Sequence, residues 1–384
     1  MRTRPRRSWA PDDGGTPLEQ LGPLPLWPMV TVFVPAYNEE RSVQAALRSV
    51  WQQDYPRERS EILVVDGMST DGTVEAVREL QREVGEDALR VVANPGRTLP
   101  EAWNIALQEA SGEVIAYVCA HSELAPDYLR VAVEALRRHG AAGVGGPYVM
   151  VGDGAKGEAI AAAMMEPFGV GASWYRYATE PGWAGSIPNA VYRRDVCRTV
   201  GLFDPQMLYG EDWDYNYRIR QLGGRLYLDP RIRFTFRVRP SLLLLWQQQF
   251  RFGAAKARNA WKHGPRCLQW HHLVPSAFIG VLGASIGLGV VCPSAWWVTA
   301  GVIAAYGAAV AATALGVARR TKTRVALLMP AVLPCMHVAY GVGFAWQLVR
   351  QTVSGCRRSR TDSARYDAAG CTSRGASEGT SGGS

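Results

Sequence analysis

Continuous apolar runs alternate with amphipathic stretches between Met29 and about Pro240. The runs "MVTVFVPAY", "EILVVDG", "RVVANP" and "EVIAYV" have no polar face, as is usual for strands buried inside a sheet. After the first run, from about Glu39, apolar residues recur at helical spacing in Val43, Leu47 and Val50. Such strands, alternating with helices, are typical of a parallel sheet covered on both sides. The pattern therefore predicts an α/β domain with a mostly parallel sheet.

Polar residues follow each predicted strand, at the edge where a parallel sheet binds its ligands. They are Tyr37, Asn38, Asp66, Asn94, Arg97 and the segment from Cys119 to Glu123. Asp66 opens the stretch "DGMSTDGT", and its carboxylate can accept the N–H of a nucleobase or hold ribose hydroxyls. Taken alone, this short stretch fits turn-capping acids better than a binding site. The sequence thus predicts a ligand edge and leaves the role of Asp66 open.

Three long apolar runs follow, at residues 273–291, 296–317 and 325–349. The first two carry no charge and are long enough to span a bilayer, whereas prolines and a histidine interrupt the third. Tryptophans stand at their margins, as at membrane interfaces. A buried helical core is the alternative, and we favour spans because three such runs follow one another. The interpretation predicts a multi-pass protein of the cell membrane with its transmembrane region at residues 273–350.

The basic loop "RRTKTR" between the second and third runs indicates the orientation. The positive-inside rule places this loop in the cytoplasm, and the catalytic region then lies in the cytoplasm as well. Three full crossings would, however, put the basic tail "RQTVSGCRRSR" outside, against the same rule. We therefore expect the third segment to be re-entrant or paired with a further span.

The composition and the distribution of charge limit the classes of partner that the chain can bind. The chain has 42 Lys and Arg against 34 Asp and Glu, and its basic clusters lie near the N-terminus or beside the apolar runs. This arrangement suits anionic lipid head groups, and no recognition-helix or stacked-aromatic signature supports nucleic acid. The seven scattered cysteines never form CxxC, which argues against a disulfide framework. Residues 1–27 are predicted to be a flexible basic arm, and the Ser/Gly-rich residues 351–384 a disordered tail.

Acidic residues gather at the start of a predicted helix in "GEDWDYNYRIRQLGG". A carboxylate at a helix start can accept a proton from a reacting group, as a general base does. Taken by themselves, Glu211, Asp212 and Asp214 fit better as acids that stabilise the first turn through the helix dipole.

Five motifs occur in one order along residues 29–260. They are "TVFVPAYNEE", "EILVVDGMSTDGT", "EAWNIALQEASGEVIAYV", "GLFDPQMLYGEDWDYNYRIRQLGG" and "QQQFRFG". Their order and spacing resemble a family 2 glycosyltransferase of the GT-A fold. With the apolar runs behind them, they look most like the membrane-bound enzymes of bacterial exopolysaccharide assembly, of the succinoglycan-biosynthesis type. The resemblance implies a GT-A nucleotide-sugar-binding domain at residues 28–240.

The resemblance also implies roles for individual residues. Those implied for the nucleotide-sugar site are Tyr37, Asn38, Glu39, Asp66, Arg97, Asn104 and Cys119. Within this set, Tyr37 would lie against the uracil or its ribose, and Asp66 would hold the uracil edge. Asp212 would be the general base of the family's Glu-Asp pair, with Glu211 before it.

The segment "CAH" stands where the family carries Asp-x-Asp, which contacts the ribose and binds the divalent cation of the diphosphate leaving group. Cys119 and His121 replace the two acids, and a thiol is a poor partner for hydroxyls and for a hard cation. His121 and Glu123 would still suit Mn²⁺, so the implied cofactor is a divalent cation, Mn²⁺ or Mg²⁺. Two alternatives remain: a buried histidine beside a core cysteine, or neutralisation of the diphosphate by Arg97, Arg193 and Arg194.

Residues 241–272 mix apolar and basic side chains, which predicts an amphipathic helix in the membrane interface or packed on the catalytic domain. Gln248 and Arg251 match a Gln-x-x-Arg-Trp motif that holds the acceptor in processive relatives, with Phe252 in place of the Trp. The resemblance implies an inverting glycosyltransferase that moves a hexose from a nucleotide sugar, UDP-linked, to a lipid-linked or growing glycan acceptor. A polyprenyl-phosphate sugar transferase and a catalytically silent nucleotide-sugar-binding scaffold are the alternatives.

Overall fold

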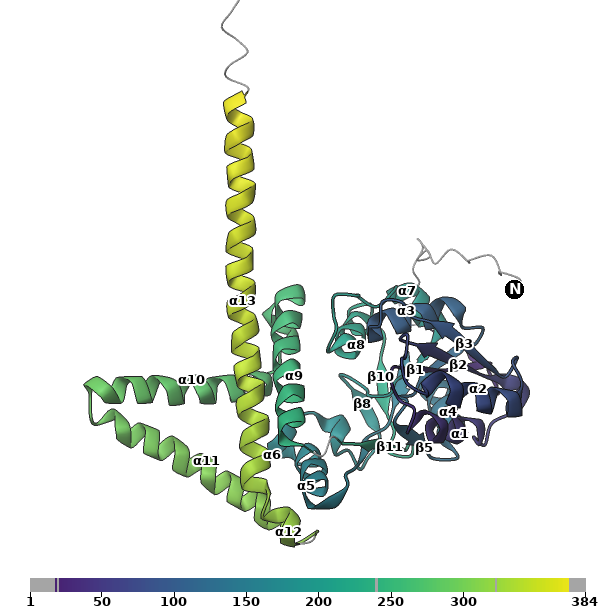
Figure 1. The fold of residues 1–384 in the computed structure, drawn as a ribbon, viewed down its shortest axis with the longest axis horizontal. Helices are drawn as coiled ribbons and strands as arrows, with labels where there is room; N and C mark the ends of the chain where they lie inside the picture. The colour runs from purple at the N-terminus through teal and green to yellow at the C-terminus, as the bar shows by residue number, and fades with distance from the viewer. Residues whose placement is uncertain (1–17, 19–20, 239–240, 322, 373–384) are drawn as a thin grey trace, which may run out of the picture.

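A computed structural model describes residue 18 and residues 21–238, 241–321 and 323–372 (Figure 1). Its main sheet has eight strands in the order β3-β2-β1-β4-β9-β6-β10-β8. They are β1 (Val30–Ala36), β2 (Ser60–Asp66), β3 (Leu89–Ala93), β4 (Val114–Tyr117), β6 (Gly143–Gly145), β8 (Gly182–Ala184), β9 (Val191–Arg193) and β10 (Leu226–Leu228). The pairs β1–β2, β1–β4, β2–β3 and β6–β10 are parallel. β9 is antiparallel to β4 and β6, and β8 to β10. The predicted mostly parallel sheet is confirmed.

Helices cover both faces of this sheet, because alternate residues of each strand point to opposite sides. The helices are α1 (Val43–Trp51), α2 (Thr73–Val84), α3 (Leu99–Glu109), α4 (Tyr128–His139), α7 (Arg194–Val200) and α8 (Glu211–Gln221), with the short turn η1 (Arg57–Arg59). Val32 and Val34 of β1 pack in one core with α1, α2 and α4. Phe33 packs in a second core with α3, α7 and α8. Burial on both sides explains why the strand sequences show no polar face.

Part of the predicted N-terminal arm lies on the domain. Leu18 is buried and its N–H donates to the carbonyl of Leu222 at 3.1 Å. Arg193 donates to the carbonyl of Gly22 at 2.7 Å. Residues 18 and 21–27 are therefore not a loose arm, because apolar residues among them join the second core. The rest of the arm, residues 1–17 and 19–20, lies outside the described residues.

A second, three-stranded sheet links the domain to the C-terminal helices. Its strands are β5 (Ser122–Leu124), β11 (Phe234–Arg237) and β7 (Tyr148–Val151), with β11 in the middle. Helices α5 (Gly154–Met165) and α6 (Pro167–Val170), the turn η2 (Trp174–Arg176) and β8 follow β7 along the chain. The apolar side of α5 packs in a third core with residues of the C-terminal helices. The catalytic domain and these helices therefore share one packed interface.

The C-terminal region consists of a helix pair and a helical hairpin (Figure 1). Its elements are α9 (Leu242–His263), η3 (Pro265–Cys267), α10 (Trp270–Val291), α11 (Ala295–Ala318), α12 (Thr323–Ala326) and α13 (Met329–Thr372). α9 and α13 lie side by side, and a Cβ at Gly253 would come within 2.0 Å of the Tyr340 carbonyl. α10 and α11 form a hairpin that leaves this pair on the side away from the sheet (Figure 1). Among the described residues, three helices are long and apolar enough to span a membrane: α10, α11 and residues 323–353.

The third of these segments departs from the prediction. It is a continuous helix rather than a re-entrant or broken one, because Pro330 and Pro334 fall near the start of α13, where few helical hydrogen bonds are lost. The helix also continues past Val349 to Thr372, where the sequence predicted disorder, since no proline interrupts this stretch. Residues 373–384 lie outside the described residues.

The basic loop after α11 contacts the catalytic domain. Arg320 pairs with Glu166 at 2.8 Å, and Arg324 with Glu158 of α5 at 3.1 Å. Both the start and the end of the α10–α11 hairpin therefore lie on the side of the catalytic domain, as Figure 1 shows. The tip of the hairpin, near Cys292, lies far from the domain (Figure 1).

Candidate active site

The loops after β1 and β2 bind each other at the carboxyl edge of the sheet. Ser69 Oγ accepts the N–H of Asn38 at 3.0 Å, and Asn38 Oδ1 accepts the N–H of Thr70 at 2.9 Å. The buried Asp66 carboxylate accepts the N–H of Ser69 at 3.2 Å. Tyr37, beside this pair of loops, is 48% exposed. The predicted residues Tyr37, Asn38 and Asp66 therefore lie together, with an aromatic ring free to cover a ligand.

Strained backbone is concentrated at this edge. Among the described residues, the non-glycine residues with positive φ are Asn38 (55°), Met68 (62°), Arg97 (59°) and Asn189 (41°). The first three follow β1, β2 and β3, and Asn189 precedes β9, which is antiparallel to β4 and so begins at the same edge. Such conformations cost of order 1 kcal/mol or more each and cluster at functional sites. The strain marks this edge as the functional one.

The loop after β4 joins the β1 loop through His121. Its Nδ1 lies 3.0 Å from Glu39 Oε1, so the acid that meets His121 is Glu39 and not the predicted Glu123, which is exposed on β5. Cys119 Sγ lies 3.5 Å from Nδ1 and 3.3 Å from Nε2, and a sulfur nearly equidistant from both nitrogens cannot lie along either N–H bond. Burial lowers the pKa of His121, but its contacts with Cys119 and Glu39 outweigh this and raise the pKa to about 10.

This arrangement is a poor metal site by itself. In the part of the chain that the structure describes, no three His, Cys, Asp or Glu side chains form a group that could hold a metal ion. A protonated His121 paired with Glu39 is not a free ligand, and Cys119 is a soft one. A cation here would take most of its ligands from the donor diphosphate.

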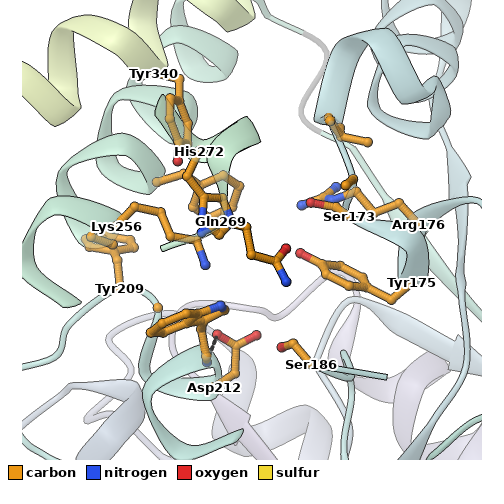
Figure 2. Close-up of a pocket in the computed structure, with 18 of the residues that line it drawn as sticks. Ser173, Tyr175, Arg176, Ser186, Tyr209, Asp212, Lys256, Gln269, His272 and Tyr340 are labelled. Atoms are coloured by element: carbon orange, nitrogen blue, oxygen red, sulfur yellow. Dashed lines mark hydrogen bonds between the residues drawn. The ribbon is translucent and has the colours of Figure 1, made fainter. Parts of the chain in front are cut away.

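A cavity of about 1260 Å³ extends from this edge to the C-terminal helices. Arg97 and Cys119 line it at the sheet edge, and much of the remainder is lined by residues 167–176, by residues 184–187 and by residues of α8, α9, α10, α11 and α13. Glu211 and Asp212, in the first turn of α8, both face it. Figure 2 shows Asp212 from α8 and Lys256 from α9 pointing into the same space. The predicted acid pair therefore reaches the cavity that Arg97 and Cys119 line at the sheet edge. The other residues predicted for the nucleotide at this edge do not line it: Tyr37, Asn38, Glu39 and Asp66.

Burial and neighbouring charges shift the pKa values of Glu211, Asp212 and Lys256. Burial raises the pKa of Glu211 well above its usual range, and the charge of Asp212 raises it further. Burial also raises the pKa of Asp212. Three groups partly offset this and lower the pKa: the N–H of Trp213, which donates to Asp212 at 2.6 Å, and the charges of Lys256 and Arg176. Burial lowers the pKa of Lys256 to about 7, although Asp212 raises it. A carboxylate with a raised pKa is a stronger proton acceptor than a solvated one, as a general base requires.

Comparison with known proteins identifies this arrangement. Residues 31–201 match the model of the family described as Glycosyl transferase family 2. The chain carries a family 2 glycosyltransferase domain. The dolichyl N-acetyl-alpha-D-glucosaminyl phosphate 3-beta-D-2,3-diacetamido-2,3-dideoxy-beta-D-glucuronosyltransferase of Methanococcus voltae is 28% identical over 233 residues, 59% of this chain and 72% of that protein. Succinoglycan biosynthesis protein ExoA of Rhizobium meliloti (strain 1021) is 28% identical over 275 residues, 70% of this chain and 82% of that protein.

A solved structure shares the fold. Mannosyltransferase PcManGT from Pyrobaculum calidifontis, in complex with GDP-Man and Mn²⁺, matches with a TM-score of 0.53 and 24% identity, over 84% of this chain and 87% of that one. The predicted GT-A fold and the predicted resemblance to exopolysaccharide glycosyltransferases are confirmed. The chain is a glycosyltransferase that uses nucleotide-sugar donors.

Several predicted residues lie away from the cavity of the glycosyltransferase domain. Asn104 binds the backbone of Phe203 with both ends of its amide, at 2.9 and 2.8 Å, and so holds a loop. Arg193 is buried against Asp195 and the carbonyl of Gly22, so it is not free for a diphosphate. Arg194 binds the carbonyl of Ser111 at 3.2 Å, also off the cavity.

The two residues predicted for the acceptor, Gln248 and Arg251, do not line the cavity. The cavity is lined by Gln249 and Phe252, whereas Gln248 does not line it. Arg251 instead borders a smaller cavity between α9 and α13, where it lies 5.1 Å from the ring of Tyr209. Gln249, Phe252 and Lys256 share one helical face at spacings of three and four, which is the signal that would have found Lys256. No sequence signal marked Arg176, which comes from the irregular segment between α6 and β8.

Proposed function

We propose that the chain is an inverting glycosyltransferase that moves a hexose from a UDP-linked donor to a hydroxyl of a lipid-linked or growing glycan acceptor. The observation that carries this proposal is the position of Asp212, which faces the cavity from the first turn of α8. The Methanococcus voltae relative supports a lipid-linked acceptor, since its name includes a dolichyl phosphate sugar.

Asp212 is the general base in this proposal. The acceptor hydroxyl attacks the anomeric carbon as the bond to the diphosphate breaks, and Asp212 removes the hydroxyl proton. A single displacement inverts the configuration, and no covalent sugar–enzyme intermediate is needed. The positive charges of Lys256 and Arg176 favour the ionised form of Asp212, so they keep the base available.

The donor lies along the carboxyl edge of the sheet in this proposal. Asp66 holds the uracil edge, the exposed ring of Tyr37 covers the base or ribose, and Arg97 lies near the nucleotide. A divalent cation on the diphosphate is compatible with the fold, since the Pyrobaculum enzyme was solved with GDP-Man and Mn²⁺. Glu39 would contact such a cation here, and His121 would join it only after it releases its proton.

The membrane position follows from the hairpin. α10 and α11 have 22 and 24 residues, about 33 and 36 Å of helix, enough for a hydrocarbon core of about 30 Å. In their most apolar stretches only 11% of residues are buried, against 44% in α13. Exposed tryptophans stand at both ends of the hairpin, with Trp270 at its base and Trp297 at its tip. We infer that the hairpin crosses the membrane twice.

α13 does not cross in this proposal. It has 44 residues, about 66 Å, and its first half is covered by α9 and by α5 of the catalytic domain. α9 and α13 then lie along the membrane surface, between the domain and the hairpin (Figure 1). Two crossings put the loop after α11 and the basic residues after Val349 on one side, the cytoplasmic side, together with the domain. This removes the conflict that three crossings create.

The test is donor binding and turnover by the purified full-length chain. A panel of nucleotide sugars, with and without Mn²⁺, should give one UDP-linked hexose that binds and is slowly hydrolysed. Asp212→Asn should keep donor affinity within about two-fold and lower turnover by about 10²–10⁴-fold. Arg82→Gln, which changes an exposed residue at the end of α2, serves as the control. Donor binding without any hydrolysis or transfer would instead indicate a silent scaffold, and near-normal turnover of Asp212→Asn would exclude Asp212 as the base.

A further inference from the structure

Four basic side chains line the acceptor side of the cavity, and we call Arg176, Arg220, Lys256 and Arg266 the basic cluster. None of the four forms an ion pair or a hydrogen bond with another side chain in the part of the chain that the structure describes. Nη1 of Arg176 is buried without a hydrogen-bond partner. The acids on the whole cavity wall are Glu211 and Asp212. The cluster therefore has a surplus of positive charge that the protein leaves uncompensated.

Aromatic rings contact three members of the cluster, and the Arg176 guanidinium lies 5.5 Å from the centre of the Tyr148 ring and 5.6 Å from that of Tyr175. Lys256 Nζ lies 4.1 Å from the centre of the Trp213 ring, and the Arg220 guanidinium 5.5 Å from that of Tyr217. These contacts stabilise the cations without neutralising them, so their charge remains available to an anion. Figure 2 shows Lys256 and Arg176 entering the cavity from opposite walls. An uncompensated cluster on converging walls is suited to a phosphate or diphosphate group.

The cluster belongs to a different part of the cavity from the donor edge. Its members come from η2, α8, α9 and η3, whereas the donor residues follow β1, β2 and β3. The cavity wall also has apolar side chains, Val274, Pro275 and Phe278 from the base of α10 and Met336 from α13, which stand beside His272, His337 and Tyr340. α10 is the first helix of the proposed membrane hairpin. A ligand that fills both parts has a charged head at the cluster and an apolar chain beside α10.

We propose that the basic cluster binds the phosphate or diphosphate of a polyisoprenyl-linked acceptor, whose chain leaves the cavity along the base of α10. This inference rests on the proposed function and specifies its acceptor. The charges of Lys256 and Arg176 both lower the pKa of Asp212, so both lie near the base. A phosphate that binds to the cluster therefore holds the attached sugar beside Asp212. Because burial lowers the pKa of Lys256 to about 7, an anionic head group that binds there also favours uptake of a proton by Lys256.

The test measures binding of farnesyl diphosphate to the full-length chain in detergent. Farnesyl phosphate, farnesol and inorganic diphosphate are compared with it, and UDP is measured in parallel. Farnesyl diphosphate or farnesyl phosphate should bind at least about ten-fold more tightly than farnesol or inorganic diphosphate, since each of these lacks one half of the ligand. Arg176→Gln and Lys256→Gln should each weaken binding of the farnesyl phosphates about ten-fold or more and change UDP affinity less than two-fold.

Two controls keep the result interpretable. Arg82→Gln removes the same charge far from the cavity and should leave every affinity unchanged. Arg220→Gln and Arg266→Gln change exposed members of the cluster, and they test the inference if the two inner variants fail to fold. Unchanged affinity for farnesyl phosphates in all four variants would overturn the inference, and so would a loss of UDP affinity alone, which would assign the cluster to the donor. If the wild-type chain binds no nucleotide, the proposed function fails instead.

Discussion

Replacing Asp214 by Asn should loosen the connection between the catalytic helix α8 and the end of α9. Asp214 stands two residues after Asp212 and is 1% exposed. Its carboxylate meets Arg218 at 3.0 Å, Lys262 at 2.9 Å and His263 at 2.6 Å. Lys262 and His263 belong to the last turn of α9, the helix that carries Lys256. The Asn variant keeps the shape of the side chain and removes the charge that pairs with Arg218 and Lys262.

The size of the effect follows from burial. Breaking a buried ion pair costs about 3–5 kcal/mol, because the remaining charges lose their partner. Here Arg218 and Lys262 keep 23% and 32% exposure, which screens part of the loss, so we expect roughly 2–3 kcal/mol. Ion-pair and hydrogen-bond partners hold the pKa of Asp214 below its usual value although burial opposes them. Its contribution is therefore complete above an unfolded-state pKa of about 3.9 and is lost as the pH falls through the folded-state pKa.

The assay is thermal unfolding of the full-length chain in detergent, with transfer activity measured in parallel. At 2–4 °C per kcal/mol, Asp214→Asn should unfold roughly 4–12 °C below the wild type at pH 7, and the gap should narrow below about pH 4. Asp204→Asn is the matched control, since Asp204 meets the same Lys262 at 2.7 Å but is 29% exposed, and it should shift unfolding by less than about 4 °C. Equal unfolding temperatures for both variants would refute the reasoning.

Three further perturbations test other parts of the molecule. Gly253→Leu should separate α9 from α13, because a Cβ at this position would lie 2.0 Å from the Tyr340 carbonyl oxygen. Limited proteolysis should then cut α9. The control is Gly283→Leu, which should be tolerated because no atom lies within 4 Å of a Cβ there. Asp66→Ala and Tyr37→Ala should each weaken UDP binding roughly ten-fold, and unchanged affinity in both would place the nucleotide elsewhere. Cys119→Asp should raise UDP affinity in Mn²⁺ by about 1 kcal/mol or five-fold; His121→Ala should erase any stimulation by Mn²⁺, and stimulation that survives would exclude His121 as a ligand.

The sequence predicts best what depends on local pattern. Apolar runs predicted the strand that ends at Asp66 and the strand that precedes Cys119. The resemblance to the family, and not the acidic first turn of α8 alone, implied the role of Asp212. The sequence predicts less well the contacts between distant loops. Glu123 is close to His121 in sequence, yet strand alternation turns it outward and Glu39, from another loop, takes its place. Nothing in a single sequence measures that distance.

The membrane region shows the same limit on a larger scale. Hydropathy does not distinguish α10, α11 and the start of α13, because each is apolar over a stretch long enough to cross a membrane. The difference between them is what covers them: protein for α13, and nothing within the described residues for most of α10 and α11. That difference depends on close contacts such as Gly253 and Gly343 with the opposite helix, which composition cannot reveal.

The number of crossings can be tested with the cysteines that the chain already has. Cys292 is exposed at the tip of the hairpin, and Cys356 and Cys371 follow the apolar part of α13. With two crossings Cys292 alone lies outside, whereas with three crossings Cys356 and Cys371 lie outside as well. A maleimide that does not cross membranes should therefore label intact cells that make the wild-type chain.

Cys292→Ser is the deciding variant, because it removes the only thiol that two crossings expose. We expect it to abolish labelling of intact cells and to leave labelling after detergent permeabilisation, which admits the reagent to accessible cysteines on the cytoplasmic side. Cys356→Ser with Cys371→Ser should label like the wild type from outside. The reverse pattern, with labelling that survives Cys292→Ser and disappears only when Cys356 and Cys371 are also replaced, would mean that α13 crosses the membrane. In that case α9 would have to accompany α13 into the bilayer, because the two helices pack closely. Arg251 and Lys262 are exposed on α9, and burying these charges in lipid would cost several kcal/mol. The packing of α9 against α13 would have to offset this cost.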